Sequence, residues 1–164
     1  SGSSFGISKV KTIEELPAAI EVAYKEDPEI LIESCLVGTE ISVGVIEFKG
    51  EVLVLPATEI VSENEFFDYE AKYLGKSEEI TPARIPEDER ERVKAEAKRI
   101  YELLNMTGLS RSEYIIQDGV PHFIEMNTNP GLSPESIIPK QALAAGITLE
   151  DLFGNLVEQA FQKK

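Results

Sequence analysis

Apolar residues recur at helical spacing along the chain, and each such stretch begins or ends at a recognisable signal. Thr12-Ile13-Glu14-Glu15 is a capping box, so we predict a helix that follows it and ends before Pro28. Pro86 precedes a second, strongly patterned helix, and Gly108 fits its exit. The apolar faces are expected to be Leu16, Ala19, Ile20 and Ala23 in the first helix and Val93, Ala97, Ile100, Tyr101 and Leu104 in the second.

The C-terminal region predicts two more helices. Gly146 fits the C-cap of a short helix over residues 141–145, and Thr148 fits the N-cap of a final helix. The side chains of the final helix that we expect to be buried are Leu149, Leu152, Phe153, Leu156, Val157 and Phe161.

Alternation of apolar and polar residues with a period of two predicts the strands. Residues 40–48 and 51–55 form one predicted strand pair, and residues 112–117 and 120–126 form another. Residues 30–33 are predicted to form a short apolar strand. Because strand pairs and helices follow one another without regular βαβ alternation, the expected fold class is α+β, with helices packed against an antiparallel sheet.

Residues 62–86 interrupt this pattern. The segment is polar and mixed, and it contains the aromatic and charged run 66–73. A stretch this long with weak periodicity is typical of a functional or mobile loop, and we expect it to be mobile.

Charge and composition exclude some classes of partner. The net charge of −14 repels phosphate backbones and anionic lipids, so nucleic-acid binding and membrane binding are not expected. The sequence contains no apolar run as long as a membrane span needs. Cys35 is the only cysteine and cannot form an internal disulfide, so we expect a cytoplasmic protein.

The clearest candidate chemistry lies in the second strand pair. Residues two apart on a strand share a face, so Arg111 points with Glu113, and Glu125 points with Asn127. A two-residue Asp118-Gly119 turn would set Glu113 opposite Ile124 and send the two carboxylates to opposite faces. We predict instead a three-residue turn over 117–119, which sets Arg111 opposite Glu125 and brings Glu113 diagonally near it.

Two close carboxylates repel each other unless a cation lies between them. Arg111 supplies one positive charge, and a magnesium ion would supply more, since oxygen ligands from glutamate and asparagine suit it. The alternative is an ordinary solvent-exposed ladder of arginine and glutamate on a sheet face.

Three further segments are weaker signals when each is taken alone. Ser1 to Gly6 is small and hydroxyl-rich, as in loops that close over phosphates, although it lacks the pattern of a Walker A loop. Lys72 and Tyr73 could reach a ligand from the loop, and Gly131 could bring a backbone N–H close to one. The alternatives are a flexible tail, a surface loop and a plain strand-to-helix connection.

Taken together, the segments resemble the D-alanine–D-alanine ligases of the ATP-grasp class over nearly the whole chain. The matching stretches are 2–10, 31–33 with 38–40, 69–73, Arg111, 125–132 and 136–139. The resemblance implies an ATP-grasp fold and an enzyme in which ATP phosphorylates the carboxylate of one D-alanine. The amine of a second D-alanine then attacks the acylphosphate, which gives the dipeptide used in peptidoglycan.

The resemblance also implies roles for single residues. Glu113, Glu125 and Asn127 would hold two Mg²⁺ (or Mn²⁺) ions, and Arg111 with the Gly131 N–H would stabilise the transferring phosphate and the tetrahedral intermediate. The other assignments place Lys72 on the ATP phosphates, Glu33 and Leu36 around the adenine, Glu40 on the ribose, Ser3 and Tyr73 in the network that positions the amino acid, and Ser136 and Ile137 against the second D-alanine.

Two departures from the family pattern qualify the resemblance. The first metal ligand is usually aspartate, whereas here it is Glu113. The resemblance places these residues after the family's N-terminal domain and most of its first ATP-grasp subdomain, so we expect this chain alone to be inactive. Residues 1–61 would be the remainder of the first subdomain and the start of the second, 62–86 the active-site loop, and 87–164 the second subdomain with the metal site.

Other functions are kept as alternatives. Within the family, a D-alanine–D-lactate ligase or another carboxylate–amine ligase would share most of these residues, although Tyr73 favours amide formation. A non-catalytic, acidic α+β binding module is the alternative from a different class. The resemblance implies ATP and D-alanine as ligands, the rest of the enzyme as partner, and a homodimer for the full-length protein.

Overall fold

The computed structural model describes residues 5–62 and 77–162, which belong to two compact units. One unit combines Ser1–Leu36 with Ser62–Glu78, and the other combines Val37–Val61 with Glu79–Lys164.

The first unit contains a short helical segment, η1 (Ile13–Glu15) followed by α1 (Leu16–Ala23). The predicted capping interaction is present, since Glu15 Oε2 accepts the backbone N–H of Thr12 at 3.4 Å. Neither η1 nor α1 has a buried residue. The strand predicted over 30–33 is wrong: Leu31 and Ile32 are 80% and 64% exposed, and no described strand pairs with them.

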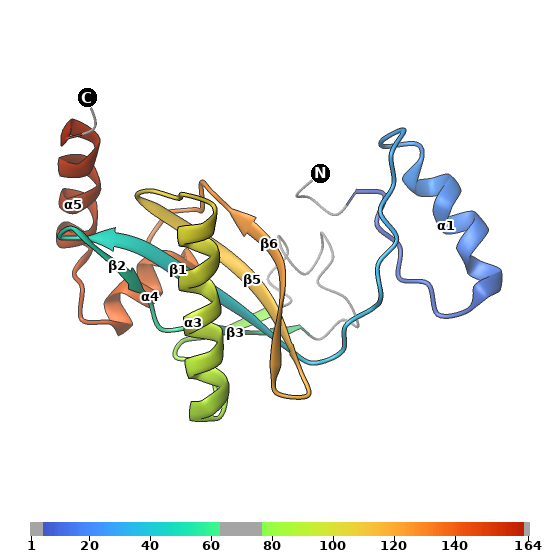
Figure 1. Ribbon diagram of the computed structural model, residues 1–164, viewed down its shortest axis with the longest axis horizontal. Coiled ribbons are helices and arrows are strands. Elements are labelled where there is room, and N and C mark those ends of the chain that lie inside the picture. Colours follow the sequence, from blue (N-terminus) through green and yellow to red (C-terminus); the bar gives the residue numbers. More distant parts are fainter. Residues whose placement is uncertain (1–4, 63–76, 163–164) are drawn as a thin grey trace. The chain divides into compact units, whose positions relative to one another are not determined.

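The second unit is built on an antiparallel sheet (Figure 1). Its strands are β1 (Thr39–Phe48), β2 (Glu51–Val54), β3 (Thr58–Ser62), β4 (Ser77–Ile80), β5 (Leu109–Gln117) and β6 (Val120–Asn127). The order is β4-β3-β1-β5-β6, and β2 also pairs with β1. The helices are α3 (Glu87–Leu103), α4 (Ile137–Ala144) and α5 (Leu149–Gln162), so the α+β prediction is confirmed.

Two apolar clusters lie on the two faces of this sheet. Ile41, Val43 and Val45 alternate along β1 and pack with the buried face of α3, whereas Ile46 packs with residues of α4 and α5. Alternate residues of a strand point to opposite faces, so α3 covers one face and the α4–α5 pair contributes to the other.

Several details of the helices and loops differ from the predictions. Leu104 is 53% exposed, because α3 ends at Leu103 and the chain turns away. In α5 only Leu152 is buried, while Phe153, Val157 and Phe161 are 37%, 56% and 78% exposed, because a single sheet face covers one side of the helix.

The segment 62–86 contains regular structure that the sequence did not indicate. Ser62 ends β3, and residues 77–80 form β4. Residues 63–76 lie outside the described residues. Among the described helices, none is long and apolar enough to cross a membrane.

Candidate functional site

One face of β5 carries the charged candidates. Ser110, Ser112, Tyr114 and Ile116 are buried on the α3 side of the strand. Arg111 and Glu113 alternate with them and therefore point to the opposite face, where their side chains are 21% and 14% exposed.

The pairing of β5 with β6 brings the two carboxylates to the same face, but not by the predicted route. The turn has two residues, Asp118 and Gly119, both with positive φ (53° and 75°), and Gln117 pairs with Val120. The predicted three-residue turn and the pairing of Arg111 with Glu125 are therefore wrong.

A β-bulge in β6 shifts the register of the β5–β6 pair by one residue. Tyr114 pairs with Phe123, but Glu113 pairs with Glu125, so Ile124 is left without a partner. The rings of Tyr114 and Phe123 meet edge to face at 5.8 Å on the α3 side. One extra residue then turns Glu125 to the face of Glu113, and Asn127 pairs with Arg111 beside them.

Hydrogen bonds hold the Glu113 carboxylate in place. Its Oε1 accepts Arg111 Nε–H at 2.8 Å and lies 3.3 Å from the hydroxyl of Ser42 on β1. Burial is the largest effect on the pKa of Glu113 and raises it. The charge of Arg111 and the hydrogen bonds from Arg111 and Ser42 lower the pKa, whereas the charge of Glu125 raises it. The net pKa is above the ordinary value, so this carboxylate would gain from a nearby cation.

The end of β6 leads into a tight turn. The backbone N–H of Asn129 donates to Asn127 Oδ1 at 2.9 Å, which orients the amide of Asn127. Beyond Gly131, the hydroxyls of Ser133 and Ser136 lie 2.9 Å apart, and Ser136 is the N-cap residue of α4. The side chain of Ile137 is buried.

Gln141 is a structural residue of this site that sequence reasoning missed. It is fully buried and bonds to β1 through both ends of its amide: Nε2 donates to the Ser42 carbonyl at 2.9 Å, and Oε1 accepts the Gly44 N–H at 2.9 Å. The available signal was its position three residues after Ile138 and four after Ile137, which places a polar side chain on an apolar helical face.

The remaining candidates are spread over the chain. Glu40 lies on β1 two residues before Ser42, and hence on the face of Glu113. Glu33 and Leu36 belong to the other compact unit. Ser3, Lys72 and Tyr73 lie outside the described residues.

The donor set fits a magnesium ion chemically. Glu113, Glu125 and Asn127 bring carboxylate and amide oxygens to neighbouring positions on one sheet face. The described residues contain no group of three or more histidine, cysteine, aspartate or glutamate side chains that would form a cage. A set of two carboxylates and one amide is typical of a site in which phosphate oxygens complete the coordination.

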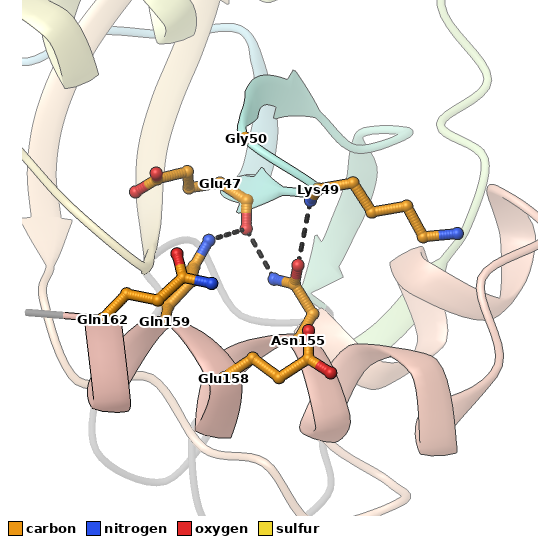
Figure 2. Close-up of a pocket in the computed structure, with 7 residues that line it drawn as sticks. All are labelled: Glu47, Lys49, Gly50, Asn155, Glu158, Gln159 and Gln162. Atoms are coloured by element: carbon orange, nitrogen blue, oxygen red, sulfur yellow. Dashed lines mark hydrogen bonds between the residues drawn. The ribbon is translucent and has the colours of Figure 1, made fainter.

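A polar pocket of about 270 Å³ lies elsewhere, between α5 and the β1–β2 turn (Figure 2). Its amides are already bonded to the backbone: Asn155 Nδ2 and Gln159 Nε2 donate to the Glu47 carbonyl at 2.7 and 2.6 Å, and the Lys49 N–H donates to Asn155 Oδ1 at 2.9 Å. These contacts attach α5 to the end of β1, and the pocket holds none of the candidate residues.

Known sequences match nearly the whole chain. The family model described as "D-ala D-ala ligase C-terminus" matches residues 1–158. A D-alanine–D-alanine ligase of Flavobacterium johnsoniae is 68% identical over 157 residues, and one of Christiangramia forsetii is 61% identical over 163. These alignments cover 96% and 99% of this chain but 49% and 50% of the relatives, so the chain spans about half their length.

Solved structures agree with the sequence comparison. The VanG D-Ala:D-Ser ligase of Enterococcus faecalis is 35% identical with a TM-score of 0.84, covering 96% of this chain and 46% of that one. The D-alanine–D-alanine ligase of Bacillus anthracis complexed with ATP is 29% identical with a TM-score of 0.77, covering 93% and 48%. The sheet and its helices are thus those of the ATP-grasp ligases, and the chain belongs to the D-Ala–D-Ala ligase C-terminus family.

Proposed function

We propose that this chain supplies the ATP-grasp catalytic portion of an enzyme that joins two D-alanines at the expense of ATP for peptidoglycan synthesis. The observation that carries the proposal is the convergence of Glu113, Glu125 and Arg111 on one face of the β5–β6 pair. The reaction proceeds through phosphorylation of one D-alanine carboxylate and attack of the second amine on the acylphosphate.

The charged residues of the sheet face carry the phosphoryl-transfer chemistry. Glu113, Glu125 and Asn127 would hold the metal ions, whose positive charge would neutralise the phosphate oxygens. Arg111 already has its Nε bonded to Glu113, which fixes the guanidinium plane and leaves its terminal nitrogens for a phosphate. The Gly131 N–H donates, with Arg111, to the negative charge that develops on the transferring phosphate and the tetrahedral intermediate.

The nucleotide and amino-acid contacts rest on the family resemblance. Glu40 binds the ribose from the same sheet face, and Glu33 and Leu36 frame the adenine. Lys72 contacts the phosphates, while Ser3 and Tyr73 position the amino acid. Ser136 and Ile137 contact the second D-alanine from the start of α4; because the Ile137 side chain is buried, its contact is assigned to the backbone.

We propose further that catalysis needs the N-terminal half that the relatives contain. The first unit exposes several apolar side chains, namely Phe5, Ile7, Ile13, Val22, Tyr24, Leu31 and Ile32. Exposed apolar groups of this number are typical of a surface that packs against another domain. The same half would hold the first D-alanine and the rest of the ATP clamp, and the complete enzyme is proposed to be a cytoplasmic homodimer.

Dipeptide synthesis tests the proposal directly. Two proteins are assayed with Mg-ATP and D-alanine: the chain alone, and the chain joined to the N-terminal half of a relative (the joined protein). We expect ligation and phosphate release by the joined protein, none by the chain alone, and loss of both in Arg111→Met. Ligation that survives both Arg111→Met and Glu113→Gln in the joined protein would refute the site.

A panel of second substrates separates the related activities. The likeness to a D-Ala:D-Ser ligase makes D-serine a specific competitor, and D-lactate tests ester formation. We expect D-alanine to give the highest kcat/KM. If the joined protein shows no magnesium-dependent ATP binding in a calorimetric titration, the chain is instead a binding module that has kept the fold.

A further inference from the structure

We propose that Ser42 is a positioning residue that fixes the Glu113 carboxylate for metal binding, and that Gln141 in turn fixes Ser42. The inference rests on the proposed function, in which Glu113 is a metal ligand. Nothing in the family resemblance assigns a role to either residue.

Ser42 lies directly opposite Glu113 in the β1–β5 pair and is fully buried. Its hydroxyl lies 3.3 Å from Glu113 Oε1, the oxygen that also accepts Arg111 Nε–H. This distance is long for a hydroxyl–carboxylate bond, but such contacts often tighten when a ligand binds. The donors come from two strands and meet on one oxygen, so they restrict rotation of the carboxylate.

A glutamate ligand needs such support more than an aspartate does. The extra methylene adds a rotatable bond, and the freedom of that bond must be lost when the carboxylate binds an ion. Because both described bonds of Glu113 end on Oε1, the carboxylate is held while Oε2 is left for an ion. Outer contacts of this kind orient metal ligands and tune affinity.

Gln141 prevents Ser42 from shifting along the sheet. The edge of β1 that faces away from β5 pairs with β3 through Glu40–Ser42 and with β2 through Val45–Phe48. The two partner strands therefore leave a gap along β1 between Ser42 and Val45. Gln141 fills that gap by bonding the Ser42 carbonyl and the Gly44 N–H at 2.9 Å each. Its Nε2 also lies 3.0 Å from the Thr58 hydroxyl of β3.

Manganese binding in the joined protein tests the inference. Free Mn²⁺ is followed by electron paramagnetic resonance during titration with ATP present, for the wild type, Ser42→Ala and Ser42→Thr. We expect Ser42→Ala to weaken Mn²⁺ binding about 10-fold to 100-fold, as loss of an outer contact does elsewhere. Ser42→Thr keeps the hydroxyl and is expected to retain most of the affinity.

Tyr101→Phe serves as the matched control. It removes a hydroxyl of α3 that donates to the Gly108 carbonyl at 3.1 Å on the sheet face opposite Glu113, so it is expected to lower the melting temperature and leave Mn²⁺ affinity unchanged. If Ser42→Ala does not fold, Ser42→Cys avoids the cavity and replaces the hydroxyl with a weak donor.

The outcomes are distinct. Wild-type affinity in Ser42→Ala, or equal losses in Ser42→Ala and Tyr101→Phe, overturns the positioning role and leaves the proposed function intact. If the wild-type protein itself binds no Mn²⁺ with ATP, the proposed function fails and this inference fails with it.

Discussion

Glu113 of β5 lies directly opposite Glu125 of β6, although the turn that joins the strands has only two residues. The bulged residue Ile124 accounts for this, because it adds one position to β6 between the turn and Glu125. Two like charges that face each other destabilise a strand pair. The pairing of Glu113 with Glu125 therefore destabilises the folded chain when no cation is bound, and a cation bound between the carboxylates removes this repulsion.

We predict that Glu125→Gln stabilises the metal-free chain slightly, by less than about 1 kcal/mol, because it removes this repulsion. We also expect Mg²⁺ to raise the melting temperature of the wild type but not that of this variant. Thermal unfolding with and without Mg²⁺ measures both effects. Glu51→Gln, an exposed position at the start of β2, is the control and should behave as the wild type. An unchanged Mg²⁺ response in Glu125→Gln would contradict the metal site.

Gln141→Leu should destabilise the second unit by about 2–4 kcal/mol. The leucine cannot satisfy the buried Ser42 carbonyl or the Gly44 N–H, and each buried unsatisfied group costs about 1–3 kcal/mol. Urea unfolding followed by circular dichroism gives the free energy. Leu143→Ala on the same helix is 53% exposed and should change stability by about 0.5 kcal/mol or less. Equal effects of the two variants would show that the amide bonds contribute little.

Ser110→Ala is expected to stabilise the protein, by up to about 1 kcal/mol. Ser110 is fully buried, and within the described part of the chain its hydroxyl has no hydrogen-bond partner. Removing an unsatisfied buried hydroxyl relieves its desolvation cost. Thr58→Val offers the contrast, since that buried hydroxyl contacts both Thr81 and Gln141 and its loss should destabilise by about 1–2 kcal/mol. A loss of stability in Ser110→Ala would point to a bound water on the hydroxyl.

The sequence predicted the long elements but not the details that build the site. Residues 40–48, 112–117 and 120–126 were identified as strands because their alternation extends over several residues. The bulge at Ile124 leaves no compositional signal, because a bulged isoleucine and a paired one look alike in a sequence. The turn prediction was therefore wrong, although the two carboxylates do share a face.

Short elements and long-range bonds were missed for a related reason. β3 and β4 have five and four residues, and they form because β3 pairs with β1 and β4 in turn pairs with β3. The contact between Gln141 and Gly44 joins residues 97 positions apart. Local patterns carry no information about such pairing, whereas the helix caps at Thr148 and Gly146 are local and were identified correctly.

Gly38→Ala should destabilise the protein by about 1–3 kcal/mol or more, because a methyl group at position 38 would overlap with the backbone carbonyl of Ile116. The backbone of β5 cannot move away without breaking its pairing with β1. Hydrogen exchange should show faster opening of the β1–β5 pair near Ile116. Gly154→Ala in α5 is the matched control, since its methyl group meets no atom and should stabilise the helix by about 0.5–1 kcal/mol. Slow exchange near Ile116 in Gly38→Ala would contradict the packing.

The ion pair between Glu59 and Arg84 should make stability depend on pH in the acid range. Arg84 Nε–H and Nη2–H donate to the two carboxylate oxygens at 2.9 and 3.0 Å, and the hydrogen bond from Arg84 is the main cause of a Glu59 pKa below the ordinary 4.5, against the opposing effect of burial. The unfolded state then binds more protons than the folded state between the two pKa values. The stabilisation is complete above the unfolded pKa and disappears as the pH falls through the folded pKa.

A double-mutant cycle isolates this contribution from other titrating groups. Unfolding free energies of Glu59→Gln, Arg84→Met and the double variant are compared with the wild type at about pH 7 and about pH 3. Because the Arg84 side chain is 61% exposed, the coupling at about pH 7 should stay below about 1 kcal/mol. It should shrink towards about pH 3, since protonation of Glu59 removes the charge. A coupling that grows on acidification would mean that Glu59 is protonated more readily in the folded state, contrary to its contacts with Arg84.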